Sequence, residues 1–272
     1  MGAGRRVVAG AVCALAAAVL SGCGPGDAGR VAVGRTSASS PAADPTRTAA
    51  TPAPKPKPKP TPTEDELAGE LSFTYHGTRP EKETINQTVD IKNDDERSLV
   101  PTLVYTALDS HRRVLPHVKV RTVYGSDRGT LAVPYGYGLD ILRFSGQGEH
   151  DVADVRVTVR GVRLAPHRAG TQEITVQPIS ASGAKVDKFS RFTALRLTNH
   201  DAFDVYVRIA YLVYDQPSKG HSQQAVAVTP IGGLVRVPAD GLALVKVTGA
   251  AAAAVARYSH GPAVSVKPYP SL

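Results

Sequence analysis

The sequence contains no tryptophan, one methionine and two cysteines among its 272 residues. Cys13 lies within an apolar N-terminal run, and the other cysteine is Cys23. If the N-terminal run is removed during export, Cys23 remains as the only thiol, so no intramolecular disulfide can form. The absence of a second cysteine in the exported chain excludes a fold stabilised by an intramolecular disulfide, and the lone Cys23 needs another explanation.

Metal-binding and nucleic-acid-binding patterns are also missing. The eight histidines include no His-x-His or His-x-x-x-His pair of the kind that binds zinc. Carboxylates at 94–96, and Asp201 with Asp204, offer calcium ligand types, but solvated turns are the simpler interpretation. The net charge of +8 is spread along the chain and does not indicate nucleic acid. We therefore expect no metal, no cofactor and no nucleic-acid partner.

The N-terminus has the parts of a bacterial export signal. Arg5 and Arg6 precede an apolar run over residues 7–20, which is too short for a stable membrane span. The string Leu20-Ser21-Gly22-Cys23 follows and resembles the lipobox of bacterial lipoproteins. The resemblance implies that residues 1–22 are a signal peptide and that Cys23 receives a diacylglyceryl group. Such a lipid would hold the chain on the extracytoplasmic face of the cell membrane. The alternative is an ordinary secretory signal with an incidental Cys23.

Residues 23–66 are rich in Pro, Ala, Thr and Ser, and proline alternates with lysine from Pro54 to Pro60. Alternating prolines remove backbone donors and favour extended polyproline II, so we expect a disordered linker. At ~3.1 Å per residue, such a linker extends to at most roughly 120 Å. Its lysines either keep it solvated or touch anionic lipid or wall polymer.

From Leu67 onward, apolar and polar residues alternate in short runs, which is typical of half-buried strands. Turns are expected at 125–129, 146–148, 232–233 and 240–241, and only 250–256 is helical in character. This spacing predicts an all-β fold of antiparallel sandwiches. The apolar positions that define the strands are Val89, Ile91, Val118, Val120, Val155, Val157, Val159, Leu195, Leu197, Val207, Ile209, Tyr211, Val213, Val264 and Val266.

The two halves repeat each other at an offset of 106 residues. Identical pairs at this offset are Asn93 and Asn199, Asp95 and Asp201, Tyr105 and Tyr211, and Asp109 and Asp215. Val133-Pro134 and Val237-Pro238 follow in the same order. The repeat predicts two β-sandwich domains, residues 67–166 and 167–272, with each asparagine capping a turn at the end of a strand.

This order of landmarks resembles the FxLYD-type and related Ig-like modules of actinobacterial-type surface lipoproteins. Tyr214-Asp215 matches the Tyr-Asp that ends a strand in those modules, whereas Leu108-Asp109 departs from it. The resemblance implies two tandem Ig-like antiparallel sandwiches and a role in surface interaction or spacing. It brings no catalytic residues.

Two short strings resemble enzyme motifs. Ser182-Gly183-Ala184-Lys185 fits the Ser-x-x-Lys of penicillin-recognising enzymes, but it lies in a Ser/Gly-rich stretch between expected strands rather than on a helix. Ser259-His260-Gly261 resembles part of the L,D-transpeptidase motif, but Pro262 stands where the nucleophilic cysteine is needed. We therefore expect a non-enzymatic binding or scaffold lipoprotein. The alternative is an enzyme or enzyme-accessory subunit of cell-wall metabolism with an unrecognised site.

Two surface hypotheses remain. Lys119, Arg121, Arg156 and Arg160 occupy outward strand positions, and they would form one basic face if their strands are neighbours in one sheet. Such a face suits anionic lipid, anionic wall polymer or an acidic envelope protein, although the arginines could simply keep strands soluble. Tyr135 and Tyr137 would either cover the rim of the core or, if exposed, stack on a sugar or peptide.

Overall fold

A computed structural model describes residues 61–77, 87–216 and 224–272. The predicted signal peptide, the lipobox-like string with Cys23 and the Pro-Lys segment lie outside these residues. The first sandwich contains β1 (Leu71–His76), β2 (Thr88–Asn93), β3 (Leu99–Leu108), β4 (Lys119–Thr122), β5 (Gly136–Ser145) and β6 (Asp154–Leu164). The second contains β7 (Thr175–Ile179), β8 (Ala194–Thr198), β9 (Val205–Tyr214), β10 (Ala225–Val237), β11 (Leu242–Lys246) and β12 (Val264–Pro270). The helices are α1 (Glu64–Gly69), α2 (Gly249–Tyr258) and the short 3₁₀ turns η1 (Ser126–Arg128) and η2 (Glu149–Asp151).

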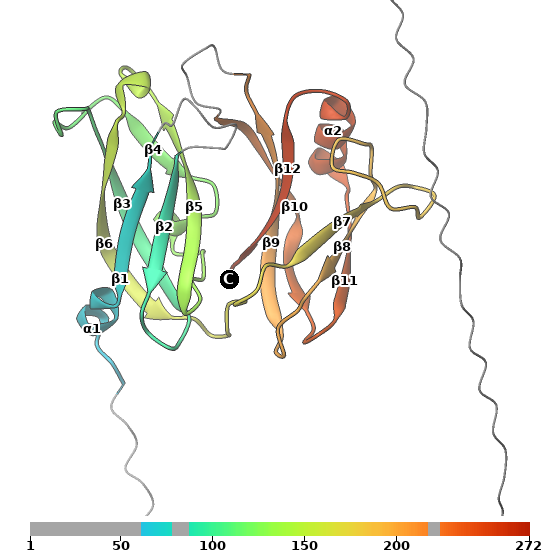
Figure 1. Ribbon diagram of the computed structural model, residues 1–272, viewed down its shortest axis with the longest axis horizontal. Coiled ribbons are helices and arrows are strands. Elements are labelled where there is room, and N and C mark those ends of the chain that lie inside the picture. Colours follow the sequence, from blue (N-terminus) through green and yellow to red (C-terminus); the bar gives the residue numbers. More distant parts are fainter. Residues whose placement is uncertain (1–60, 78–86, 217–223) are drawn as a thin grey trace, which may run out of the picture. The chain divides into compact units, whose positions relative to one another are not determined.

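Each sandwich pairs two antiparallel sheets, which confirms the expected all-β fold (Figure 1). In the first, the sheet β1-β2-β5-β4 faces β3-β6. In the second, β11-β8-β7 faces β10-β9-β12. The period-two pattern accounts for the packing, because Val89 of β2 and Val155 of β6 point inward to one cluster while their neighbours face outward.

Strand β9 is buried on both faces in its second half. Its odd-numbered residues, Ile209 and Tyr211 among them, pack in the core of the second sandwich. Ala210, Leu212 and Tyr214 point the other way and share a core with residues of the first sandwich. The uninterrupted apolar run from 209 to 214 is the sequence pattern of such a doubly covered strand.

The two sandwiches are also joined by backbone hydrogen bonds. Leu131 forms an antiparallel bridge with Ser271. The Ala132 N–H donates to the Pro270 carbonyl at 3.1 Å, and the Leu272 N–H donates to the Thr130 carbonyl at 3.1 Å. Residues 130–132 therefore hold the chain segment that continues from β12.

A buried asparagine fixes the same corner in each sandwich. The Asn93 amide donates to the carbonyls of Arg97, Val133 and Pro134, and its oxygen accepts the Asp95 N–H. The Asn199 amide repeats this pattern with the carbonyls of Phe203, Val237 and Pro238 and the N–H of Asp201. The two landmarks of the sequence repeat, Asn and Val-Pro, are thus hydrogen-bonded to each other, and the expected capping role is confirmed.

Two local features differ from expectation. Helix α1 crosses the boundary placed at residue 66, because Thr63 and Glu66 form a capping box in which each side chain bonds the other's backbone N–H. The expected turn at Gly232-Gly233 is instead a bulge inside β10, where the register with β9 shifts between Ile231 and Val235. Gly232 has φ +67°, a left-handed conformation that favours glycine and lets the strand bend without ending.

Proline is found only in edge strands among the described strands. Pro178 of β7 faces away from its neighbour β8, because its carbonyl accepts from the Val186 N–H. Pro270 of β12 likewise faces away from β9, since its carbonyl accepts from Ala132. A proline has no N–H, so these positions offer no donor to an incoming strand. The prolines within strands are Pro101, Pro178, Pro230, Pro268 and Pro270.

Replacing either asparagine should destabilise the fold. Asn93→Ala and Asn199→Ala each remove three hydrogen bonds to buried or partly buried carbonyls, so we expect the free energy of unfolding to fall by about 1–3 kcal/mol. Asn93→Asp should cost at least as much at neutral pH, because a carboxylate cannot donate to three carbonyls. Urea denaturation followed by circular dichroism measures both. Asp94→Ala, which removes only an exposed ion pair with Lys92, is the control and should change stability by less than about 1 kcal/mol. Equal stability of Asn93→Ala and the control would contradict the capping role.

Candidate functional site

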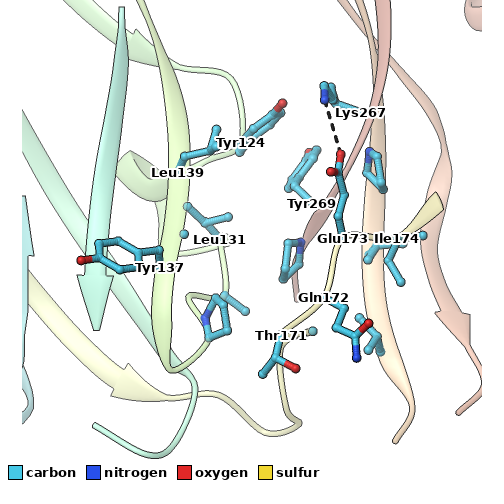
Figure 2. A pocket seen from close by; sticks show the side chains of 18 of the residues that line it. Tyr124, Leu131, Tyr137, Leu139, Thr171, Gln172, Glu173, Ile174, Lys267 and Tyr269 are labelled. Atoms are coloured by element: carbon cyan, nitrogen blue, oxygen red, sulfur yellow. Dashed lines mark ion pairs between the residues drawn. The ribbon is translucent and has the colours of Figure 1, made fainter. Parts of the chain in front are cut away.

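A groove of about 650 Å³ lies between the two sandwiches (Figure 2). One wall comes from β2, β5 and residues 131–134, and the other from residues 170–174, β9 and β12. The lining is mostly apolar and aromatic, with a few polar groups at its margin, which is the composition of ligand sites in general. Leu131, Ile141 and Ile174 contribute aliphatic surface.

Tyrosine rings from both sandwiches meet in the groove. Tyr124, which follows β4, stacks on Tyr269 of β12 with a centroid distance of 4.3 Å and an interplanar angle of 21°. Burial raises the pKa of both phenols, so the hydroxyls stay protonated in the physiological range. The two rings cover each other's faces and so join the two walls at this point, and their hydroxyls are neutral groups that can donate or accept hydrogen bonds.

Charged groups lie at the margin of the groove. The ammonium of Lys267 is 3.5 Å from the carboxylate of Glu173, and both side chains are solvent-accessible. An exposed pair of this kind contributes about 0–1 kcal/mol, so a ligand can replace either partner at little cost. Asp90 also lines the groove, and its carboxylate is 2.7 Å from the His76 ring nitrogen.

The wall that carries Tyr124 is held by a buried carboxylate. Asp140 is fully buried and accepts backbone N–H bonds from Tyr124 at 2.7 Å, Ser126 at 2.9 Å and Ile141 at 2.7 Å. The Ser126 hydroxyl in turn bonds the Tyr105 hydroxyl at 2.6 Å. Burial raises the pKa of Asp140, whereas the N–H donors act in the opposite direction. This carboxylate fixes the chain from 124 to 126 and so positions the stacked tyrosines.

The opposite wall is held by a second carboxylate. Asp201 is buried and accepts the backbone N–H of Thr171 at 3.1 Å and of Gln172 at 3.3 Å, together with the Thr171 hydroxyl. Its own N–H is bonded to Asn199. The corner asparagine of the second sandwich thus supports, through Asp201, the segment that lines the groove.

The structure separates the basic residues expected to act together. Lys119 and Arg121 lie on β4, which pairs with β5, whereas Arg156 and Arg160 lie on β6, which pairs with β3 in the other sheet. All four side chains are exposed. The condition for a single basic face, that these strands are neighbours in one sheet, is therefore not met.

Tyr135 and Tyr137 do not cover the core. Their exposed fractions are 59% and 69%. Tyr137 lines the groove on the outer face of β5, with its ring turned away from the opposite wall in Figure 2. The exposure leaves the stacking hypothesis open for both rings.

The other candidate residues are held in local contacts. Asp94 bonds Lys92, Asp95 bonds Arg97, and Asp204 bonds Arg236. Glu96 is exposed in the same turn as Asp94 and Asp95. Among the described residues, no group of three or more metal-ligating side chains gathers.

The strings that resemble enzyme motifs lie outside the groove lining. Ser182 is in the exposed turn between β7 and β8, where its hydroxyl is 2.9 Å from that of Ser180, and Lys185 bridges back to Ile179. Ser259 follows the last residue of α2. No helix in the described part of the chain is long and apolar enough to cross a membrane.

Apart from Tyr137, the candidate residues proposed from the sequence did not include the aromatic and charged residues of the groove. Asp140 had a detectable signal, because it is a carboxylate within the apolar run Leu139-Asp140-Ile141-Leu142. Tyr124, Glu173 and Tyr269 come from separate segments, and nothing local in the sequence connects them. Comparison with protein-family models, with curated proteins and with solved structures gave no match.

Substituting Asp140 tests how this wall is held. In Asp140→Asn the amide nitrogen cannot accept the Ser126 N–H, so we expect a loss of about 1–3 kcal/mol in the free energy of unfolding. Asp151→Asn, an exposed carboxylate in η2, is the matched control and should change stability by less than about 0.5 kcal/mol. Urea denaturation gives both values, and equal stability of the two variants would contradict this role.

Proposed function

We propose that the protein is a lipid-anchored, non-enzymatic binding protein of the cell envelope and that the groove between its sandwiches holds the ligand. The groove carries this proposal: it combines aliphatic and aromatic lining, a weakly paired Glu173 and Lys267, and walls fixed by buried carboxylates. Such walls are formed before a ligand arrives, which lowers the entropy cost of binding.

The lipobox supports the anchoring part of the proposal. A lipid on Cys23 and a linker over 23–66 would place the sandwiches outside the membrane at a distance set by the linker. The exposed Lys119 and Arg121 on one sheet and Arg156 and Arg160 on the other suit contact with anionic lipid or wall polymer as two separate pairs.

Anchoring is tested by removing the acceptor sulfur. We expect Cys23→Ala to abolish incorporation of an acyl-chain probe in cells, because no other residue of the exported chain can form the thioether. Cys13→Ala is the matched control and should keep full labelling, since the signal peptide is cleaved away. A labelled Cys23→Ala variant, or an unlabelled wild type, would refute the anchor.

Ligand binding in the groove is tested with an introduced fluorophore. The chain has no tryptophan, so Gln172→Trp places a unique reporter on the groove wall, and Gln147→Trp places one in an exposed loop of the first sandwich. Titration with soluble peptidoglycan fragments, anionic wall polymer and synthetic peptides should shift the emission of Gln172→Trp with at least one probe. The emission of Gln147→Trp should stay constant. Identical responses from both reporters would place binding outside the groove.

A further inference from the structure

Strand β5 has a partner on only one side along its first half. Residues 136–141 pair with β2, and β4 pairs on the other side only with Leu142–Ser145. Beyond Thr122 the chain of β4 leaves the sheet and leads to Tyr124. The segment 136–139 is therefore a free sheet edge within an otherwise central strand.

The hydrogen-bond alternation of β5 fixes which groups point to this edge. The Ile141 carbonyl accepts the Val123 N–H at 2.9 Å, so residue 141 points away from β2. The Leu142 N–H donates to the Gln87 carbonyl at 2.7 Å, on the β2 side, as alternation requires. By the same alternation, the N–H and C=O groups of Leu139 and Tyr137 point away from β2. No hydrogen bond within the described ranges occupies these groups on that side.

Asp140 is the reason that the edge stays free. Its carboxylate accepts the Ile141 N–H, which points to the β4 side and would otherwise donate to the Val123 carbonyl, and it also accepts the N–H groups of Tyr124 and Ser126. The ladder between β4 and β5 therefore stops, while the chain at 124–126 remains held close by. A buried carboxylate thus replaces a backbone partner and leaves the next backbone groups of β5 unsatisfied.

The free edge faces the groove. Figure 2 shows Leu139, Tyr124 and Leu131 beside β5, with Tyr269 and Glu173 on the wall across from them. The opposite wall includes Pro268 and Pro270, which cannot donate. Strand β5 therefore presents regularly spaced backbone donors and acceptors to the groove. The residues around β5 present apolar surface.

We propose that the groove takes an extended peptide segment of a partner protein, which adds to β5 as a further strand beside Gly136–Leu139. The unpaired N–H and C=O groups of Tyr137 and Leu139 match a peptide backbone, whose groups alternate with the same period. This inference rests on the proposed function, because it names the ligand class of the same groove.

The lining of the groove also determines which types of side chain this peptide needs. Positions that point into the groove meet the exposed Leu139 and the partly exposed Tyr269 and require apolar residues. The lining carries the carboxylates of Asp90 and Glu173 against the single ammonium of Lys267, so an excess of negative charge remains. A lysine or arginine on the peptide complements this charge.

The ligand is found and tested with the full unlipidated chain, Cys23→Ala. Short randomised peptides displayed on their encoding nucleic acid are selected on this chain, and the most enriched peptide is synthesised. We expect alternating apolar residues with at least one basic residue. N-methylation of each peptide amide in turn should weaken binding by about tenfold at the amides that face β5 and much less at the intervening ones, since tenfold corresponds to about 1.4 kcal/mol, near the value of one hydrogen bond.

A substitution in β5 gives an independent test of strand addition. Leu139→Pro removes the N–H that points into the groove while the pairing with β2 is kept, and it should weaken binding more than Leu139→Ala, which keeps the N–H. Thermal denaturation confirms that both variants fold, and the N-methyl series on the unchanged chain decides the question if Leu139→Pro does not.

The outcomes separate this inference from the proposed function. Failure to enrich any peptide, or affinity insensitive to the position of N-methylation, overturns strand addition. If the Gln172→Trp reporter still responds to a sugar or polymer, groove binding stands while strand addition fails. If the reporter responds to no probe, the proposed function of the groove fails as well.

Discussion

The buried asparagine at the corner of each sandwich is the interaction on which the rest of the structure depends. One amide satisfies three carbonyls from two separate turns, and its oxygen orders the chain after the strand. Because these groups are largely shielded from water, a group that lacks a hydrogen-bond partner within the protein keeps most of its desolvation cost. The corner fixes where Val133-Pro134 and Val237-Pro238 lie, and these turns lead into the strands that follow.

Local periodicity predicted the strands well but left their neighbours undetermined. Alternation identifies which side chains of β4 and β6 face outward, yet it carries no information about the sheet to which each strand belongs. That assignment depends on pairings between distant segments, and the four basic residues consequently fall on two sheets. The Gly232-Gly233 bulge is another case that local sequence does not decide, because two adjacent glycines are equally compatible with a turn and with a bulged strand.

The groove was harder to predict because its walls are made by tertiary contacts. The sequence repeat indicates two equivalent units, but β9 of the second unit also packs its Ala210, Leu212 and Tyr214 against residues of the first unit. The supporting carboxylates also differ, since Asp201 belongs to the repeat whereas Asp140 does not. The asymmetry of the interface thus lies in positions where the repeat has diverged.

The prolines at the sheet edges have a consequence if the proposed lipid holds the protein on a membrane surface. Molecules tethered to one surface collide far more often than they do in dilute solution, and strand edges are the natural seeds for their aggregation. Pro268 removes a donor from the outer edge of β12, and the outward carbonyls of Pro178 and Pro270 are already bonded by the N–H groups of Val186 and Ala132. A chain built in this way can be crowded on a surface while those edges resist polymerisation into shared sheets.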